Sequence, residues 1–166
     1  MRKVLVFATV LALGFLAAPA LGEENVLPLF TRALETEGLT LNLVHVNNAT
    51  VDSLFTAPSK YSIRARANQV ALFYVQGRPQ EAGKLSTDFA LEQNGQTVAG
   101  VVHNIQNFVA GDVAAGTKLD ALLEFPTKLD PSRPFTVRNG KAAVSFELSA
   151  KALELLKASQ PPTATQ

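Results

Sequence analysis

The stretch FTVRNGKAAVSFEL, from Phe135 to Leu148, gives the clearest indication of the fold. An Asn-Gly pair between two runs of alternating apolar residues is typical of a β-hairpin with a two-residue turn. A turn at Asn139-Gly140 pairs Arg138 with Lys141 and Val137 with Ala142. The apolar residues then share one face, which consists of Phe135, Val137, Ala142, Val144, Phe146 and Leu148. The polar residues share the other face, which consists of Thr136, Arg138, Lys141, Ser145 and Glu147.

A second Asn-Gly pair lies in DFALEQNGQTVAGVVHNIQNF, residues 88–108. A two-residue turn at Asn94-Gly95 pairs Leu91 with Val98, so that Val98 and Val102 face the core. His103 then lies on the solvent side, with Asp88 and Glu92. A three-residue turn would move the register by one residue and turn His103 and Ile105 inward. The shorter turn is favoured because it matches the Asn-Gly preference and buries the two valines.

Further strands are indicated on both sides of these hairpins. Leucines alternate with polar residues in LTLNLVHV, residues 39–46, and His45 falls on the leucine side. VALFYV, residues 70–75, is apolar on both faces, as in a strand covered on both sides. The alternation in Leu119–Phe125 predicts another strand that Pro126 ends, and YSIRARA, residues 61–67, predicts a strand with Arg64 and Arg66 on one face.

Helices are expected near the two ends of the chain. Apolar positions at helical spacing indicate a short helix within residues 23–37, with an edge strand or an irregular arm as the alternative. Ser149 can cap a helix over AKALELLKA, residues 150–158. Around Val51–Phe55 a short helix or a loop is expected. Together these elements predict a mainly β fold, namely an antiparallel immunoglobulin-like β-sandwich with short N- and C-terminal helices. We expect this sandwich to form one domain over residues 23–158, followed by a disordered tail over residues 159–166.

The first 22 residues have the order of a secretory signal peptide. Arg2 and Lys3 precede an apolar run that ends at Ala20-Leu21-Gly22. This run is too short for a spanning helix, which is the alternative interpretation. We therefore expect export to the periplasm or the extracellular space with cleavage after Gly22, cleavage after Ala20 being the next possibility, and no stable membrane anchor afterwards.

Charge and cysteine content narrow the class of the exported chain. Loss of Arg2 and Lys3 leaves 13 of the 15 basic residues against 14 acidic ones. A nearly neutral chain gives no electrostatic reason to expect nucleic-acid binding. The chain has no cysteine, so disulfides, thiolate metal sites and a cysteine nucleophile are excluded.

A stretch from Val113 to Pro126, VAAGTKLDALLEFP, resembles a pattern in secreted bacterial immunoglobulin-like sandwich proteins of the telokin-like group. Ala115-Gly116 and Phe125-Pro126 match the bend and the strand end of that pattern, whereas Ala121 stands where the group usually has glycine. The resemblance implies a secreted interaction or binding domain and transfers no catalytic residue.

No motif of a familiar enzyme class is present. The sequence lacks HExxH, a Gly-x-Ser-x-Gly elbow, the phosphate-binding glycine loops and the calcium loop. His45 and His103, the two histidines, make an insufficient metal site, and Asp88 and Glu92 are expected to be solvated charges rather than an acid–base pair. We therefore expect no enzyme activity, cofactor or metal, a hydrolase with scattered residues being the remaining alternative.

The candidate partner-binding residues are Tyr61, Arg64, Arg66 and His103. An arginine pair beside a tyrosine can bind an anion or stack on a partner, although such charges also occur simply to solubilise a surface. The leading hypothesis is a non-enzymatic exported domain that binds a protein or a component of the cell envelope. The alternative is a carrier of a small apolar ligand or lipid in a cavity between the sheets, because ten phenylalanines could line such a cavity.

Overall fold

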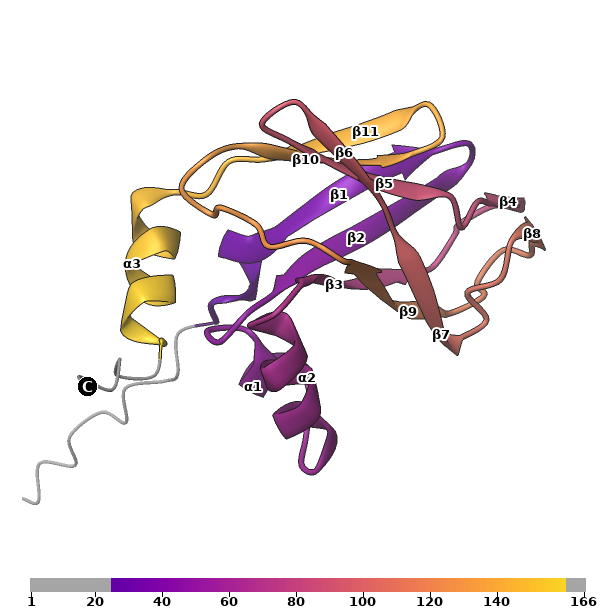
Figure 1. Cartoon of the computed structure of the whole chain (residues 1–166). Helices are drawn as coiled ribbons and strands as arrows, with labels where there is room; N and C mark the ends of the chain where they lie inside the picture. The colour runs from indigo at the N-terminus through magenta and orange to yellow at the C-terminus, as the bar shows by residue number, and fades with distance from the viewer. Residues whose placement is uncertain (1–24, 161–166) are drawn as a thin grey trace, which may run out of the picture.

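A computed structural model describes residues 25–160 of the chain. The predicted signal peptide and residues 161–166 of the predicted tail lie outside the described residues. Within them, the chain forms eleven strands, three α-helices and one 3-10 helix, and all pairings between these strands are antiparallel. The prediction of a mainly β, antiparallel fold is confirmed (Figure 1).

Most strands belong to two sheets that face each other across one core (Figure 1). The five-stranded sheet has the order β1 (Thr31–Thr36), β2 (Leu39–Val46), β3 (Ala71–Gly77), β9 (Leu119–Phe125), β7 (Val101–Gln106). The four-stranded sheet has the order β11 (Ala142–Phe146), β10 (Phe135–Asn139), β5 (Phe89–Gln93), β6 (Gln96–Ala99). A small pair, β4 (Gly83–Leu85) and β8 (Gly111–Val113), lies at one end.

Aromatic side chains fill the space between the two sheets. The rings of Phe135 and Phe146 stack with centroids 5.0 Å apart, and Phe73 of the opposite sheet lies 5.4 Å from Phe146 and 5.9 Å from Phe135. All three phenylalanines are buried. Burial of such large apolar side chains is the main favourable contribution to a fold that has no disulfide.

The hairpin between β5 and β6 has the predicted two-residue turn. Asn94 and Gly95 have φ of 53° and 77°, as a type I′ turn requires, and Leu91 lies opposite Val98. Val98 and Val102 pack against the core, and the side chain of His103 is 55 % exposed. The prediction that His103 lies on the solvent side is confirmed.

The hairpin between β10 and β11 has the predicted faces but another register. Val137 lies opposite Val144 and Asn139 opposite Ala142, so Gly140 and Lys141 form the turn. The side chain of Asn139 is buried, and its amide donates to the carbonyl oxygens of Ser86 (3.0 Å) and Asp88 (3.2 Å). The predicted pairing of Val137 with Ala142 is wrong by two residues, and a shift of two keeps every side chain on its own face.

The chain passes from one sheet to the other at Gly100. Its N–H donates to the carbonyl oxygen of Phe89 (2.8 Å), which continues the pairing of β6, and β7 then pairs with β9 in the other sheet. A Cβ atom at Gly100 would lie 2.8 Å from side-chain atoms of both Leu123 and Phe125. The absence of a side chain therefore lets the crossing strand lie directly on the core.

Two predicted elements are wrong. The predicted helix within residues 23–37 is a 3-10 turn, η1 (Leu27–Phe30), followed by β1 at the edge of the five-stranded sheet, which agrees with the edge-strand alternative. The predicted strand at residues 61–67 is a helix, α2 (Ser59–Ala67). In each case pairing or packing with distant residues selects between two patterns that the local sequence permits.

The other helices agree with the predictions. The short helix α1 (Val51–Leu54) lies beside α2, under the five-stranded sheet in Figure 1. The C-terminal helix α3 (Ala150–Ala158) lies at the opposite end from β4 and β8. The Ser149 hydroxyl accepts a hydrogen bond from the N–H of Ala152 (3.2 Å) and so caps α3 as expected. No helix within residues 25–160 is long and apolar enough to cross a bilayer.

Candidate functional site

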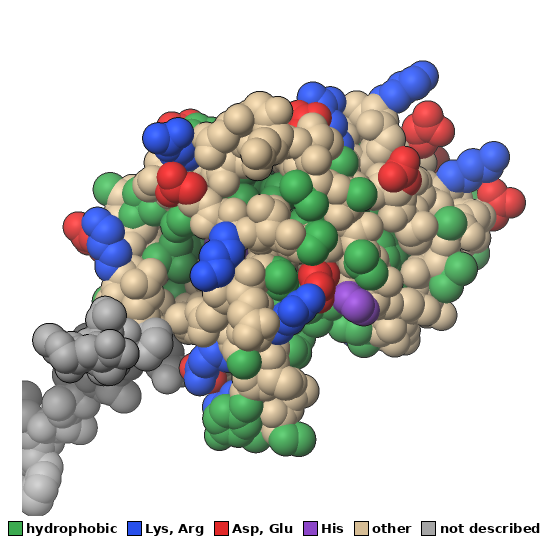
Figure 2. All heavy atoms as spheres, in the orientation of Figure 1, with side chains coloured by type: hydrophobic (Ala, Val, Ile, Leu, Met, Phe, Trp, Pro, Cys, Tyr) green, Lys and Arg blue, Asp and Glu red, His purple; other side chains and the backbone are tan. Residues whose placement is uncertain are grey.

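Two of the four candidate residues, Arg66 and His103, meet at a third side chain, Glu124. Arg66 at the end of α2 donates from Nε to Oε2 of Glu124 (3.2 Å) and from Nη2 to Oε1. His103 Nε2 lies 3.5 Å from Glu124 Oε2. Figure 2 shows histidine, acidic and basic side chains adjacent on this face of the molecule. We call Arg66, Glu124 and His103 the charged cluster.

The charged cluster lies on the outer face of the five-stranded sheet because β7 has crossed to β9. His103 therefore has Glu124 as its carboxylate neighbour, and the expectation that it shares a side with Asp88 and Glu92 is wrong. Glu92 instead accepts a hydrogen bond from Arg138 Nε (2.5 Å) on the four-stranded sheet. The hydrogen bond from Arg66 lowers the pKa of the Glu124 carboxyl below its ordinary value, which keeps this carboxylate ionised.

Arg64 and Tyr61 lie apart from this cluster. Arg64 Nη2 lies 2.5 Å from Asp52 of α1, and Lys60 Nζ lies 3.2 Å from the same carboxylate. The hydrogen bond from Lys60 has the largest effect and lowers the pKa of the Asp52 carboxyl below its ordinary value, and Arg64 lowers this pKa further. Tyr61 is 61 % exposed, with the Lys60 ammonium 5.4 Å from its ring centroid. The expectation that Arg64 and Arg66 share a strand face near Tyr61 is therefore wrong, because all three residues lie in the helix α2.

The apolar residues around His103 are the feature that sequence reasoning missed. Val101 is 51 % exposed, Ile105 55 % and Val109 63 %, and with Tyr61 they are the large hydrophobic residues exposed in the described part of the chain. Val101 and Ile105 stand two residues before and after His103. The outward direction of His103 already implied that Val101, two residues earlier on the regular part of the strand, points outward too.

The backbone of β7 adds to this exposure. β7 is the outermost strand of its sheet and pairs with β9 on one side. Its register shifts between Asn104 and Gln106, where a bulge interrupts the pairing. An edge strand that presents backbone groups and apolar side chains together is a surface on which another chain can pair. We call Val101, His103 and Ile105 with this open edge the β7 surface.

A buried carboxylate anchors the neighbouring end of β9. Asp120 is almost fully buried, accepts a hydrogen bond from the Tyr74 hydroxyl (2.9 Å) and lies 2.7 Å from Lys118 Nζ. Burial has the largest effect on the Tyr74 hydroxyl and, together with the hydrogen bond to Asp120, raises its pKa to about 12. The Asn107 amide donates to the carbonyl oxygen of Lys118 (3.1 Å), which fixes the end of β7 to the same region. These contacts hold the β7 surface in place.

No group of three metal-ligating side chains comes together within the described residues. His45 faces the phenylalanines between the sheets, whereas His103 points to solvent. Comparison with family models, with curated proteins and with solved structures gave no match.

Proposed function

We propose that the protein is an exported, non-enzymatic domain with an immunoglobulin-like β-sandwich architecture that binds a protein partner through the β7 surface. The observation that carries this proposal is the concentration of exposed apolar side chains along one open edge strand. Val101 and Ile105 lie on β7 and Val109 follows this strand, so the three fall within nine residues of sequence.

The chemistry of the β7 surface fits an extended peptide segment. Such a segment can pair with the open backbone edge, and its alternate side chains then lie beside Val101, His103 and Ile105. Apolar side chains on the partner gain the most, because Arg66 is already neutralised by Glu124. The charged cluster limits which side chains fit next to His103.

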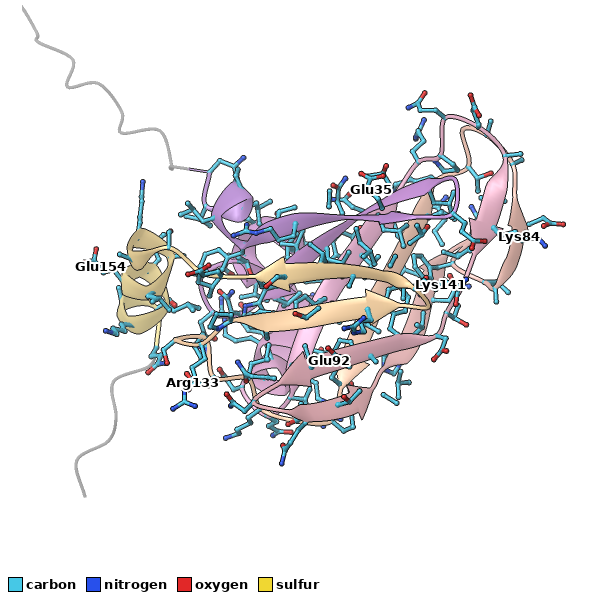
Figure 3. All side chains as sticks on the ribbon, turned by 90° about the horizontal axis from the view of Figure 1, so that it is seen from above. Glu35, Lys84, Glu92, Arg133, Lys141 and Glu154 are labelled. Atoms are coloured by element: carbon cyan, nitrogen blue, oxygen red, sulfur yellow. The ribbon has the colours of Figure 1, made fainter. Side chains whose placement is uncertain are left out.

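Other surfaces have the character of solvated faces. Figure 3 shows Glu92 and Arg133 on the side of the four-stranded sheet, and Lys141 at the β10–β11 turn. Charges of both signs spread in this way contribute solubility rather than a docking area. The aromatic packing between the sheets likewise favours partner binding over storage of an apolar ligand in the inter-sheet space.

Site-specific photo-crosslinking in the cells that produce the protein tests this proposal. A photoreactive residue replaces Ile105 in one variant and Thr136, on the four-stranded sheet, in the control. We expect one defined protein adduct from position 105 and none from position 136. Val101→Lys in the position-105 variant should reduce the adduct about tenfold, because a charged side chain loses apolar contact.

Each alternative gives a different result. An adduct with an envelope glycan or lipid would replace the protein partner by another class of envelope component. Equal adducts from positions 105 and 136, or an adduct unaffected by Val101→Lys, would show that the β7 surface is not the binding site.

A further inference from the structure

A second candidate site lies at the α3 end of the molecule, away from the β7 surface. Here a pocket of about 460 Å³ opens between the end of β2, the end of α2, the connection from β9 to β10, and α3. Figure 2 shows hydrophobic side chains in the hollow between α3 and the sheets. We call this cavity the α3 pocket; its volume is within the range that small-molecule sites have.

Two buried polar atoms of its lining residues have no partner. His45 is 7 % exposed, and its Nδ1 makes no hydrogen bond. The Asn48 amide donates to Asn68 Oδ1 (3.1 Å), whereas the buried Asn48 Oδ1 accepts none. Buried polar groups are nearly always hydrogen-bonded, so two unpaired atoms beside one cavity indicate a missing hydrogen-bonding group.

The charge of the α3 pocket points to an anion. Lys128 lines it, and within residues 25–160 no acidic side chain lines it. Lys128 makes no ion pair in this part of the chain, whereas Asp130 nearby bonds Ser132 and Arg133 instead. A lysine that lines a pocket and has no carboxylate partner is suited to bind a carboxylate.

The rest of the lining contains the polar residues Asn47, Asn68 and Gln160. It also contains the apolar side chains of Val70, Leu129 and Leu156, which come from three different segments of the chain. We propose that the α3 pocket binds a small organic acid whose carboxylate pairs with Lys128, whose apolar body contacts these three side chains, and whose inner end carries a hydroxyl for His45 and Asn48. This site is independent of the β7 surface, so either proposal can fail without the other.

Binding of octanoate, ω-hydroxyoctanoate and octanol to the purified exported chain tests the proposal by calorimetry and by NMR shifts at Lys128 and Leu156. We expect saturable binding at one site, tightest for ω-hydroxyoctanoate. Lys128→Gln should weaken both acids about tenfold and leave octanol unchanged. Lys141→Gln is the matched control, because Lys141 lies on the β10–β11 turn, and it should have no effect.

Specific outcomes would overturn the proposal. Absence of saturable binding by either acid would remove the site. Equal loss in the two lysine variants would show non-specific attraction of an anion. Equal affinity for octanoate and ω-hydroxyoctanoate would remove the role assigned to His45 and Asn48.

Discussion

His45 is a histidine surrounded by aromatic rings. The centroids of Phe73, Phe135 and Phe30 lie 5.3, 5.8 and 6.5 Å from its ring centroid. Burial lowers the pKa of His45 to about 4, because the charged imidazolium would lose its hydration there. This residue therefore links the stability of the core to pH.

Replacing His45 by leucine should remove this link. In the unfolded chain His45 binds a proton near pH 6.5, whereas in the folded chain it does so near pH 4. Stability is therefore lost as the pH falls between these two values, by about 3 kcal/mol in total. We expect His45→Leu to lack this loss, as measured by urea unfolding at pH 7 and pH 4.

The matched control is His103→Leu, because His103 is exposed and makes its contact with Glu124 on the surface. It should keep the acid-induced loss that His45 causes. If His45→Leu and the unmodified chain lose the same stability over this range, burial of the neutral imidazole is not the source of the pH dependence.

At the scale of elements, the crossing strand depends on Gly100. An alanine there would place a methyl group 2.8 Å from the side chains of Leu123 and Phe125, closer than real contacts allow. We expect Gly100→Ala to lower the free energy of unfolding by about 1–3 kcal/mol. Chemical denaturation measures this loss, and Ala99→Val at the exposed preceding position should stay within about 0.5 kcal/mol. Equal effects of the two changes would contradict the steric argument.

The local sequence predicts the elements whose signal is local. The turn at Asn94-Gly95, the alternation in Leu39–Val46 and the cap at Ser149 each act within a few residues, and all three are confirmed. The predicted register of the β10–β11 hairpin is wrong at Asn139. The amide of Asn139 donates to the carbonyl oxygens of Ser86 and Asp88, about fifty residues away, and no local pattern reveals such a contact.

Helix α2 shows the same limit for a short segment. Its residues alternate as a strand would, but its partly buried positions are Lys60, Ile63, Arg64 and Ala67, at helical spacing. The segment has too few apolar residues to distinguish a strand period from a helix period.

The pairing of β7 with β9 is also non-local. The exposure of His103 was therefore predictable from the sequence, whereas its contact with Glu124 was not.

At the scale of the molecule, the two sheets are joined along both sides. The continuous chain of β6 and β7 joins one side. On the other side the Arg32 guanidinium, at the start of β1, donates to the carbonyl oxygen of Glu147 (3.0 Å), just after β11. Both joints lie within the described residues and after η1.

Removal of the predicted signal peptide should therefore leave the folded domain intact. We expect the exported chain to begin at Glu23, and its intact mass distinguishes this start from Leu21, the product of cleavage after Ala20. Ala20→Leu combined with Gly22→Leu should block cleavage and retain the precursor in the membrane fraction, because the small residues of the cleavage site are lost. Leu148→Ile, outside that site, is the control and should be processed normally. An exported protein that still begins at Met1 would contradict cleavage, whereas a precursor held in the membrane without these changes would favour the anchor interpretation.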